Sequence, residues 1–173
     1  MAKLRIEGPW PAWAEGIQAG ALEDASGRSA RVLIRGLDRD ADESSLDALQ
    51  EEARCLADIR HPGMLRLLHV TSRQGKAAHV YKFFEGVSLG RLLSHQRERQ
   101  TFLPVKICGE LSAAVATALA QAEVSLKESY PGRRLIHRGP APEDILINDT
   151  GRIKVSGIGA HRTGDLLPLP LIG

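Results

Sequence analysis

Residues 135–159, LIHRGPAPEDILINDTGRIKVSGIG, decide how this chain is interpreted. Two short apolar runs, DILIN and RIKV, flank the turn DTG and predict a β-hairpin. A His-Arg pair precedes the hairpin, in the order of an active-site loop. Glycine stands at residues 139 and 157, however, where such a loop would need acids. The first question is therefore whether the chain carries out a reaction.

Composition limits the class of protein. A chain of 173 residues suits one compact domain, and its 43% hydrophobic and 25% charged residues are typical of a globular protein. The 23 basic and 21 acidic side chains leave a net charge of +2. Because dedicated nucleic-acid binders carry a stronger and more clustered basic excess, we expect no nucleic-acid partner.

Cysteine and histidine give no sign of a metal site. Cys55 and Cys108 both lie in apolar helical patterns, which predicts two buried free thiols. The six histidines have no metal-ligand spacing, so we expect no bound metal. The N-terminus has no apolar signal core and no stretch approaches a membrane span, so we expect no membrane insertion and a cytoplasmic location.

The first half of the chain is predicted to be mainly strands. Apolar runs and turn residues indicate strands at 3–8, 17–24, 28–37, 64–70 and 77–84. One helix is expected at 44–60, where apolar residues recur at helical spacing before the sequence HPG. The expected order is three strands, a helix and two strands.

The second half begins with two predicted helices, at 89–99 and 104–128. The longer one has an apolar stripe rich in small residues, so we expect another element to pack closely on it; the stripe consists of Ile107, Cys108, Leu111, Val115, Ala118, Leu119 and Ala122. Residues 161–173 form a Leu/Pro tail without a period, which we expect to be extended.

Three stretches in this order resemble a bacterial Ser/Thr protein kinase domain: EEARCLADIRHPGMLRLLHV (51–70), VYKFFEGVSLGRLL (80–93) and residues 135–159. The resemblance implies an α+β fold with a five-stranded antiparallel sheet and one main helix. It further implies a helical lobe that is truncated after the catalytic hairpin. The expected parts are a sheet lobe and hinge (1–86), a partial helical lobe (87–160) and the tail (161–173).

The phosphate-binding positions of the kinase pattern are altered. Its three loop glycines fall on or near Trp10, Ala12 and Glu15, which are poorly suited to a phosphate. The VAIK position reads VLIR, which puts Arg35 in place of the lysine. The resemblance gives Arg35 a partner in Glu52. We favour this ion pair over a solvated Glu52, because a guanidinium binds a carboxylate through two parallel bonds.

The catalytic positions are altered as well. The pattern HRD reads His137-Arg138-Gly139, and the pattern DFG reads Gly157-Ile158-Gly159. Asp144 occupies the metal-binding Asn position; it could in principle ligate Mg²⁺, but we expect a surface carboxylate before the strand. Losing the base and a metal ligand removes the electrostatic core of phosphoryl transfer. The resemblance therefore predicts a pseudokinase that is not an enzyme.

The remaining positions are interpreted mainly as structural. His137 and Arg138 are expected to hold the loop together, and Tyr81 takes the gatekeeper position, which narrows an adenine pocket without closing it. The hairpin region is basic and could meet an acidic partner, although a solvated face is the simpler interpretation; its residues are Arg133, Arg134, His137, Arg138, Arg152 and Lys154.

A scaffold function follows from these expectations. A long apolar helix without the rest of a kinase lobe would expose a patch, which another subunit or a second copy would cover. The expected partner surface comprises Ile107, Leu111, Val115, Leu119, Arg133, Arg134 and Arg138. We expect no cofactor. The alternative hypothesis is a nucleotide-sensing regulatory module that binds ATP without phosphoryl transfer.

Overall fold

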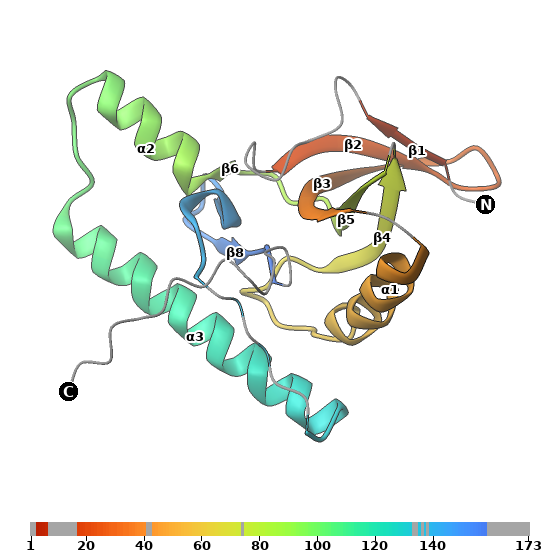
Figure 1. The fold of residues 1–173 in the computed structure, drawn as a ribbon. Helices are drawn as coiled ribbons and strands as arrows, with labels where there is room; N and C mark the ends of the chain where they lie inside the picture. The colour runs from red at the N-terminus through yellow and green to blue at the C-terminus, as the bar shows by residue number, and fades with distance from the viewer. Residues whose placement is uncertain are drawn as a thin grey trace.

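The computed structural model describes residues 3–6, 17–40, 43–73, 75–132, 135, 137 and 139–158. These residues form a sheet lobe, which is a curled five-stranded antiparallel sheet with one helix against it (Figure 1). They also form a helical lobe, in which two helices surround a three-stranded sheet. The predicted α+β fold is confirmed.

The sheet of the first lobe has the strand order β1-β2-β3-β5-β4. Its strands are β1 (Lys3–Ile6), β2 (Ile17–Glu23), β3 (Ser29–Asp40), β4 (Leu67–Arg73) and β5 (Lys76–Lys82). β4 lies three residues further along the chain than predicted, because it stays paired with β5 as far as Arg73 and Lys76. The polar residues before this short connection therefore belong to the strand.

The central strand β3 is covered on both faces. Val32 and Ile34 pack with Val80 on one face, whereas Leu33 and Leu37 face helix α1 (Glu43–Ala57) on the other. Because side chains alternate along a strand, Arg35 shares the face of Leu33 and Leu37. The strand thus directs one charged side chain into the space between the lobes.

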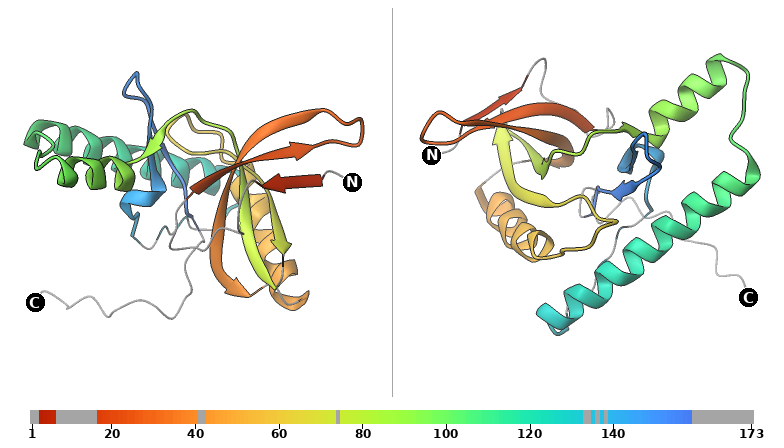
Figure 2. Two further views of the ribbon diagram at one scale, coloured as in Figure 1. Left: turned by 90° about the horizontal axis from the view of Figure 1, so that it is seen from above. Right: turned by 180° about the vertical axis from the view of Figure 1, so that it is seen from behind.

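The helical lobe is built around the sheet β6-β7-β8. Its elements are β6 (Val87–Ser88), α2 (Leu89–Glu98), α3 (Val105–Ser129), the short 3₁₀ helix η2 (Pro142–Asp144), β7 (Ile145–Ile147) and β8 (Ile153–Val155). Two turned views show the hairpin β7–β8 between the helices and the five-stranded sheet (Figure 2). The hairpin is therefore placed where the two lobes meet.

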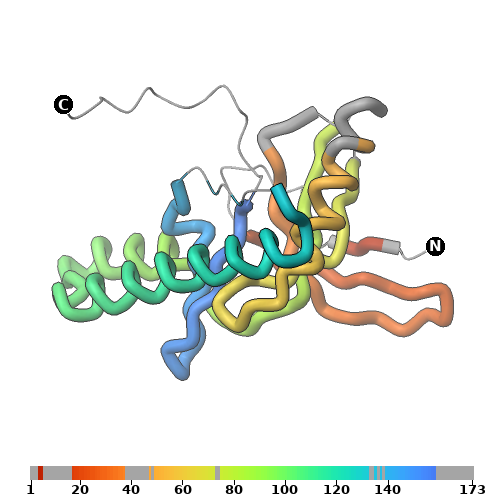
Figure 3. The backbone as a smooth tube through the Cα atoms, turned by 90° about the horizontal axis from the view of Figure 1, so that it is seen from below, coloured from red at the N-terminus to blue at the C-terminus, as the bar shows by residue number. Residues whose placement is uncertain are grey.

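Helix α3 lies across the hairpin and the loop after α1 (Figure 3). Val115, Ala118 and Ala122 are buried against a cluster that includes Met64 and Val155. A Cβ added to Gly63 would lie 2.7 Å from Cβ of Ala118, so the predicted close packing on the small-residue stripe is confirmed.

The first turns of α3 differ from the prediction. Ile107 is 39% exposed and Cys108 is exposed, although both belong to the predicted apolar stripe. The expectation of two buried thiols is therefore wrong for Cys108 and right for Cys55. The reason is tertiary, because the hairpin covers only the later turns of α3.

None of the helices in the described residues combines the length and apolar character that crossing a bilayer requires. The Leu/Pro tail at 161–173 and the loop positions Trp10, Ala12 and Glu15 lie outside the described residues. The division of the chain at residue 86 stays a prediction.

Candidate functional site

The candidate site lies between the lobes, where a cation from one meets an anion from the other. Nη2 of Arg35, on β3, is 2.9 Å from Oδ1 of Asp144, at the end of η2. The two side chains are 2% and 0% exposed. The expectation that Asp144 is a surface carboxylate is therefore wrong: it is the fully buried partner of Arg35.

Its own lobe holds Asp144 in place. Oδ2 accepts a hydrogen bond from the backbone N–H of Ala141 (3.0 Å), which closes the single turn of η2. Its backbone carbonyl accepts from the N–H (2.8 Å) and hydroxyl (3.1 Å) of Ser156. Pro142 begins this turn, where its missing N–H costs nothing. The carboxylate is thus held by contacts within its own lobe as well as by Arg35.

Gly157 lies directly against this carboxylate. A Cβ built on Gly157 would be 2.3 Å from Oδ1 of Asp144, closer than two such atoms approach. Gly157 also has φ +82, a conformation that side chains other than glycine's adopt at a cost. The replacement of the acid of the DFG pattern by glycine is therefore coupled to the position of Asp144.

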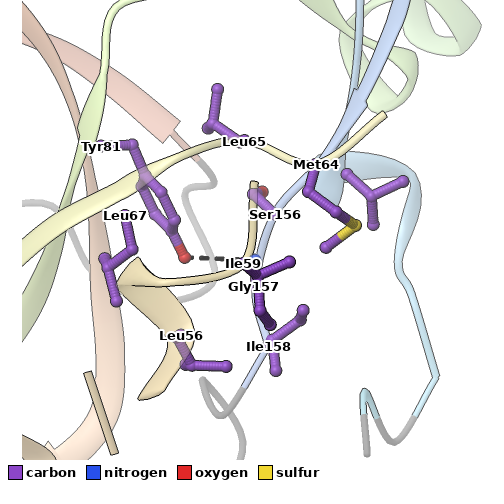
Figure 4. Close-up of a pocket in the computed structure, with 10 residues that line it drawn as sticks. Leu56, Ile59, Met64, Leu65, Leu67, Tyr81, Ser156, Gly157 and Ile158 are labelled. Atoms are coloured by element: carbon purple, nitrogen blue, oxygen red, sulfur yellow. Dashed lines mark hydrogen bonds between the residues drawn. The ribbon is translucent and has the colours of Figure 1, made fainter. Parts of the chain in front are cut away.

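A second contact joins the lobes through Tyr81, on β5. Its hydroxyl oxygen accepts from the backbone N–H of Gly157 (3.3 Å; Figure 4). The same oxygen lies 3.0 Å from Nδ1 of the buried His79. Burial, above all, raises the pKa of Tyr81 well above its usual value, and the charges of Asp144 and Glu52 add to this effect. Tyr81 is therefore a neutral hydrogen-bonding group that fills the space behind the ion pair.

The cavity beside Tyr81 is small. It measures about 20 Å³, which is enough for about one water molecule. Figure 4 shows Leu56, Ile59 and Leu67 closing it from the sheet lobe, with Ile158 from the segment after β8. The gatekeeper position is therefore packed against the hairpin.

His137 has a structural role. It is buried, and Nε2 contacts the backbone carbonyl of Ser156, which ties the loop to the residue after strand β8. Nδ1 has no hydrogen-bond partner within the described residues. The predicted loop-holding role of His137 agrees with this contact. Arg138, Arg133 and Arg134 lie outside the described residues.

Glu52 lies on α1 and is half-buried. Its charge acts on Tyr81, so it belongs to the same electrostatic environment as Arg35. The Arg35–Glu52 pair stays a prediction, while the ion pair with Asp144 is the contact that sequence reasoning missed. One signal was available: Arg35 is the charged residue within the apolar run 32–37, and a charge in such a run needs a buried partner.

The arrangement does not fit a bound metal ion. Oδ1 of Asp144 lies 2.9 Å from the cationic Nη2 of Arg35 without a hydrogen bond, Oδ2 accepts from Ala141, and Gly157 has no side chain that could ligate. The described residues contain no group of three or more His, Cys, Asp or Glu that could hold a metal. The carboxylate of Asp144 is therefore paired with the guanidinium of Arg35. A metal ion at this position would compete with that cation for the same carboxylate.

A separate apolar groove lies between α2 and α3. It has a volume of about 460 Å³ and is lined by Leu89, Leu93, Leu103, Cys108, Leu111, Ser112, Val115, Ala116, Leu119, Pro140 and Ile145. Of the predicted partner surface, Leu111, Val115 and Leu119 line this groove, whereas Ile107 is exposed outside it. Phe102 and Val105, in the connection between the helices, are 90% and 88% exposed.

The fold and the site define a two-lobed domain with an ion pair in its cleft, and comparison with known proteins names the family. The family described as protein tyrosine and serine/threonine kinase matches residues 14–166. Wall-associated receptor kinase-like 14 of Arabidopsis thaliana is 32% identical over 133 residues, which cover 77% of this chain and 18% of that protein. The tyrosine-protein kinase transforming protein Abl of Abelson murine leukemia virus is 30% identical over 141 residues, or 79% and 17%. This chain belongs to the protein tyrosine and serine/threonine kinase family.

The comparisons also bear on the predicted loss of catalysis. The relatives are named as protein kinases, and Integrin-linked protein kinase 1 of Arabidopsis thaliana is 25% identical over 150 residues, covering 86% of this chain and 29% of that protein. The prediction that the chain is not an enzyme is contradicted by its membership of this family. The chain spans roughly a fifth of the length of three of these relatives, at 18%, 21% and 17%.

Proposed function

We propose that this kinase-family domain works as a protein-interaction subunit, a scaffold, that binds an amphipathic helix of another protein in the groove between α2 and α3. The observation that carries the proposal is the groove itself, which is apolar, open and flanked by the exposed Phe102 and Val105. Contiguous exposed apolar surface of this kind marks an interaction site. A bacterial origin remains part of this hypothesis.

The shape and charge of the groove favour a helix with acidic flanks. Two helices that meet in a V leave a trough lined by leucines, and an amphipathic helix fills such a trough with leucine-type anchors. Basic residues outnumber acidic ones along α2 and the start of α3: Arg91, Arg97, Arg99 and Lys106 stand against Glu98 and Glu110. Charge complementarity would therefore steer an acidic partner to this face.

The helix α2 adds a second argument. It has no buried residue in the described structure, although Leu89 and Leu93 lie on its groove side. Ser88 caps its start by accepting a hydrogen bond from the backbone N–H of Arg91 (3.2 Å). A helix that is well capped but little buried gains stability from a partner that covers its apolar side.

The test is the mass of the native complex isolated from the protein's own cell. Leu93→Asp puts a charge in the groove, and Val124→Asp is its matched control, because Val124 is 57% exposed on α3 and does not line the groove. We expect the wild type and the control to be recovered in a complex larger than the chain, and Leu93→Asp to be recovered alone. A complex that persists in Leu93→Asp, or a monomer in all three, contradicts the proposal. If the complex has the mass of two identical chains, the partner in the groove is a second copy of this chain and not a helix of another protein.

A nucleotide-sensing module that binds ATP is a second candidate, supported by one observation. Nε and Nη1 of Arg35 have no hydrogen-bond partner among the described residues, so the guanidinium keeps donors for a phosphate. If ATP binds, a hundredfold excess over its dissociation constant stabilises the fold by about 2.7 kcal/mol. Thermal unfolding with and without ATP measures this, and an unchanged midpoint with every nucleotide removes the candidate.

A further inference from the structure

The ion pair joins the two lobes through Arg35 and Asp144, which lie 109 residues apart in the sequence. Arg35 comes from the middle of the five-stranded sheet, and Asp144 comes from the turn before β7. Both side chains are withdrawn from water, so neither has solvent to replace its partner. The pair exists only while the lobes are closed on each other.

Both partners keep buried side-chain atoms without a hydrogen bond among the described residues: Oδ1 of Asp144, and Nε and Nη1 of Arg35. Asp144 is fixed by its own lobe through Ala141 and Ser156. Arg35 directs Nη2 to Asp144, while Nε and Nη1 have no hydrogen-bond partner within the described residues. Buried N–H groups are normally hydrogen-bonded, so a buried guanidinium with two unpaired nitrogens can still bind a further hydrogen-bond acceptor. Asp144 therefore meets only part of what Arg35 can bind.

The same carboxylate occupies the position next to Gly157. Oδ1, the atom nearest Nη2 of Arg35, is also the atom that a Cβ at residue 157 would meet at 2.3 Å. The space in front of Arg35 is therefore taken by a group of the protein itself. Tyr81 seals the adjoining side through its contact with the N–H of Gly157.

Backbone hydrogen bonds also join the two lobes. Leu65 donates its N–H to the carbonyl of Val155 (2.8 Å), and Val155 donates to the carbonyl of Gly63 (2.8 Å). These bonds lie between the loop after α1 and strand β8. They can persist while the side-chain contacts of Arg35 and Tyr81 separate, because they do not involve the same groups.

We propose that Arg35 and Asp144 form an interlobe latch, an internal ion pair that withholds Arg35 from external anions until the lobes separate. Asp144 is the internal competitor of such an anion. The ligand class that can replace it is a phosphate group, since its oxygens match the fork of a guanidinium. The latch does not involve the groove between α2 and α3. It can therefore be tested separately from the proposed interaction function.

The experiment uses inorganic phosphate as the probe and Asp144→Asn as the variant. Asparagine keeps the shape and can still accept from Ala141, but it carries no charge to hold Arg35. The matched control is Glu110→Gln, which neutralises an exposed carboxylate in the pair with Lys106. Affinity is measured by calorimetric titration at constant ionic strength. Because apparent affinity falls with the fraction of competent state, we expect phosphate to bind Asp144→Asn on the order of tenfold to a hundredfold more tightly than wild type.

Equal phosphate affinity in the wild type and Asp144→Asn would overturn the latch, as would an equal gain in Glu110→Gln. A second variant, Arg35→Met with Asp144→Asn, tests whether the gain belongs to Arg35: the latch requires that it disappear. A measurement on the wild type alone guards against a variant that does not fold. Hydrogen exchange of the Gly157 amide should become faster in phosphate than in chloride of the same ionic strength, and an unchanged rate contradicts the proposal.

Discussion

The carboxylate of Asp144 occupies the space that a side chain at residue 157 would need: a Cβ on residue 157 would lie 2.3 Å from the carboxylate oxygen that pairs with Arg35. The two altered positions of the kinase pattern are therefore one structural unit. Glycine at 157 gives the acid at 144 the room it needs to reach across the cleft.

Gly157→Ala should be destabilising for two separable reasons. The left-handed backbone (φ +82) costs alanine about 1–2 kcal/mol. The overlap with Asp144 adds about 1–3 kcal/mol, as overpacking does. Gly27→Ala is the matched control, since Gly27 has φ +80 and nothing within 4 Å of an added Cβ. Chemical denaturation should give a larger loss at 157 than at 27; equal losses would mean that Asp144 does not crowd the position.

Breaking the buried ion pair from one side should be costly. Arg35→Met leaves the carboxylate of Asp144 buried without its cation, which costs about 3–5 kcal/mol. Adding Asp144→Asn removes the stranded charge, so the double variant should be more stable than Arg35→Met alone. A double-mutant cycle by denaturant unfolding measures the coupling. The exposed pair of Lys106 and Glu110 is the control and should show no measurable coupling. Additive losses at 35 and 144 would contradict the pairing.

The stability of the fold should depend on pH in the alkaline range because of Tyr81. Burial raises its pKa in the folded state above the usual value of 10.0, so the neutral form is stabilised by folding. The stability that this group contributes is complete below pH 10.0 and is lost as the pH rises toward the folded-state pKa, by up to about 1.4 kcal/mol per pH unit. Unfolding measured above pH 10 checks the slope.

Tyr81→Phe should reduce that slope, at the cost of the hydrogen bond with Gly157, about 1 kcal/mol at neutral pH. Tyr130→Phe is the comparison, because a hydrogen bond to Asp58 raises the pKa of Tyr130 to about 12 and adds a slope of the same sign. If Tyr81→Phe leaves the alkaline slope unchanged, the phenol is not buried in a closed cleft.

The two cysteines should react with thiol reagents at very different rates. Cys108 is exposed in the first turn of α3, whereas Cys55 is 5% exposed in the core beneath α3. We expect one label per chain in native buffer, on Cys108, and two in denaturant, as measured by peptide mass. Labelling of Cys55 at a comparable native rate would show that the core around it opens.

Much of the fold could be predicted from the sequence, because the local signals agree with the tertiary arrangement. Alternating and continuous apolar runs located the strands, and helical spacing located α1 and α3. Boundaries were less accurate: β4 continues through polar residues, because pairing with β5 outweighs their turn preference. The stripe on α3 was predicted too far toward its start, because only tertiary contacts decide where burial ends.

The partner of Arg35 was beyond sequence reasoning for a physical reason. A pattern supplies the type of residue at each position, but ion pairing depends on which charges the folded chain brings within a few ångströms. The local sequence around Asp144, directly before a strand, predicts an exposed carboxylate. The turn of η2 instead points it inward, and Ala141 and Ser156 hold it there.

The kinase-family architecture and the glycines at residues 139 and 157 can be recognised in the amino-acid sequence, since periodicity and residue identity are properties of the chain. Three features depend on the folded arrangement: the burial of Asp144 against Arg35, the closing of the space beside Gly157 by Tyr81, and the open groove between α2 and α3. Those contacts join residues far apart in the chain, and their energies exist only once the lobes have met.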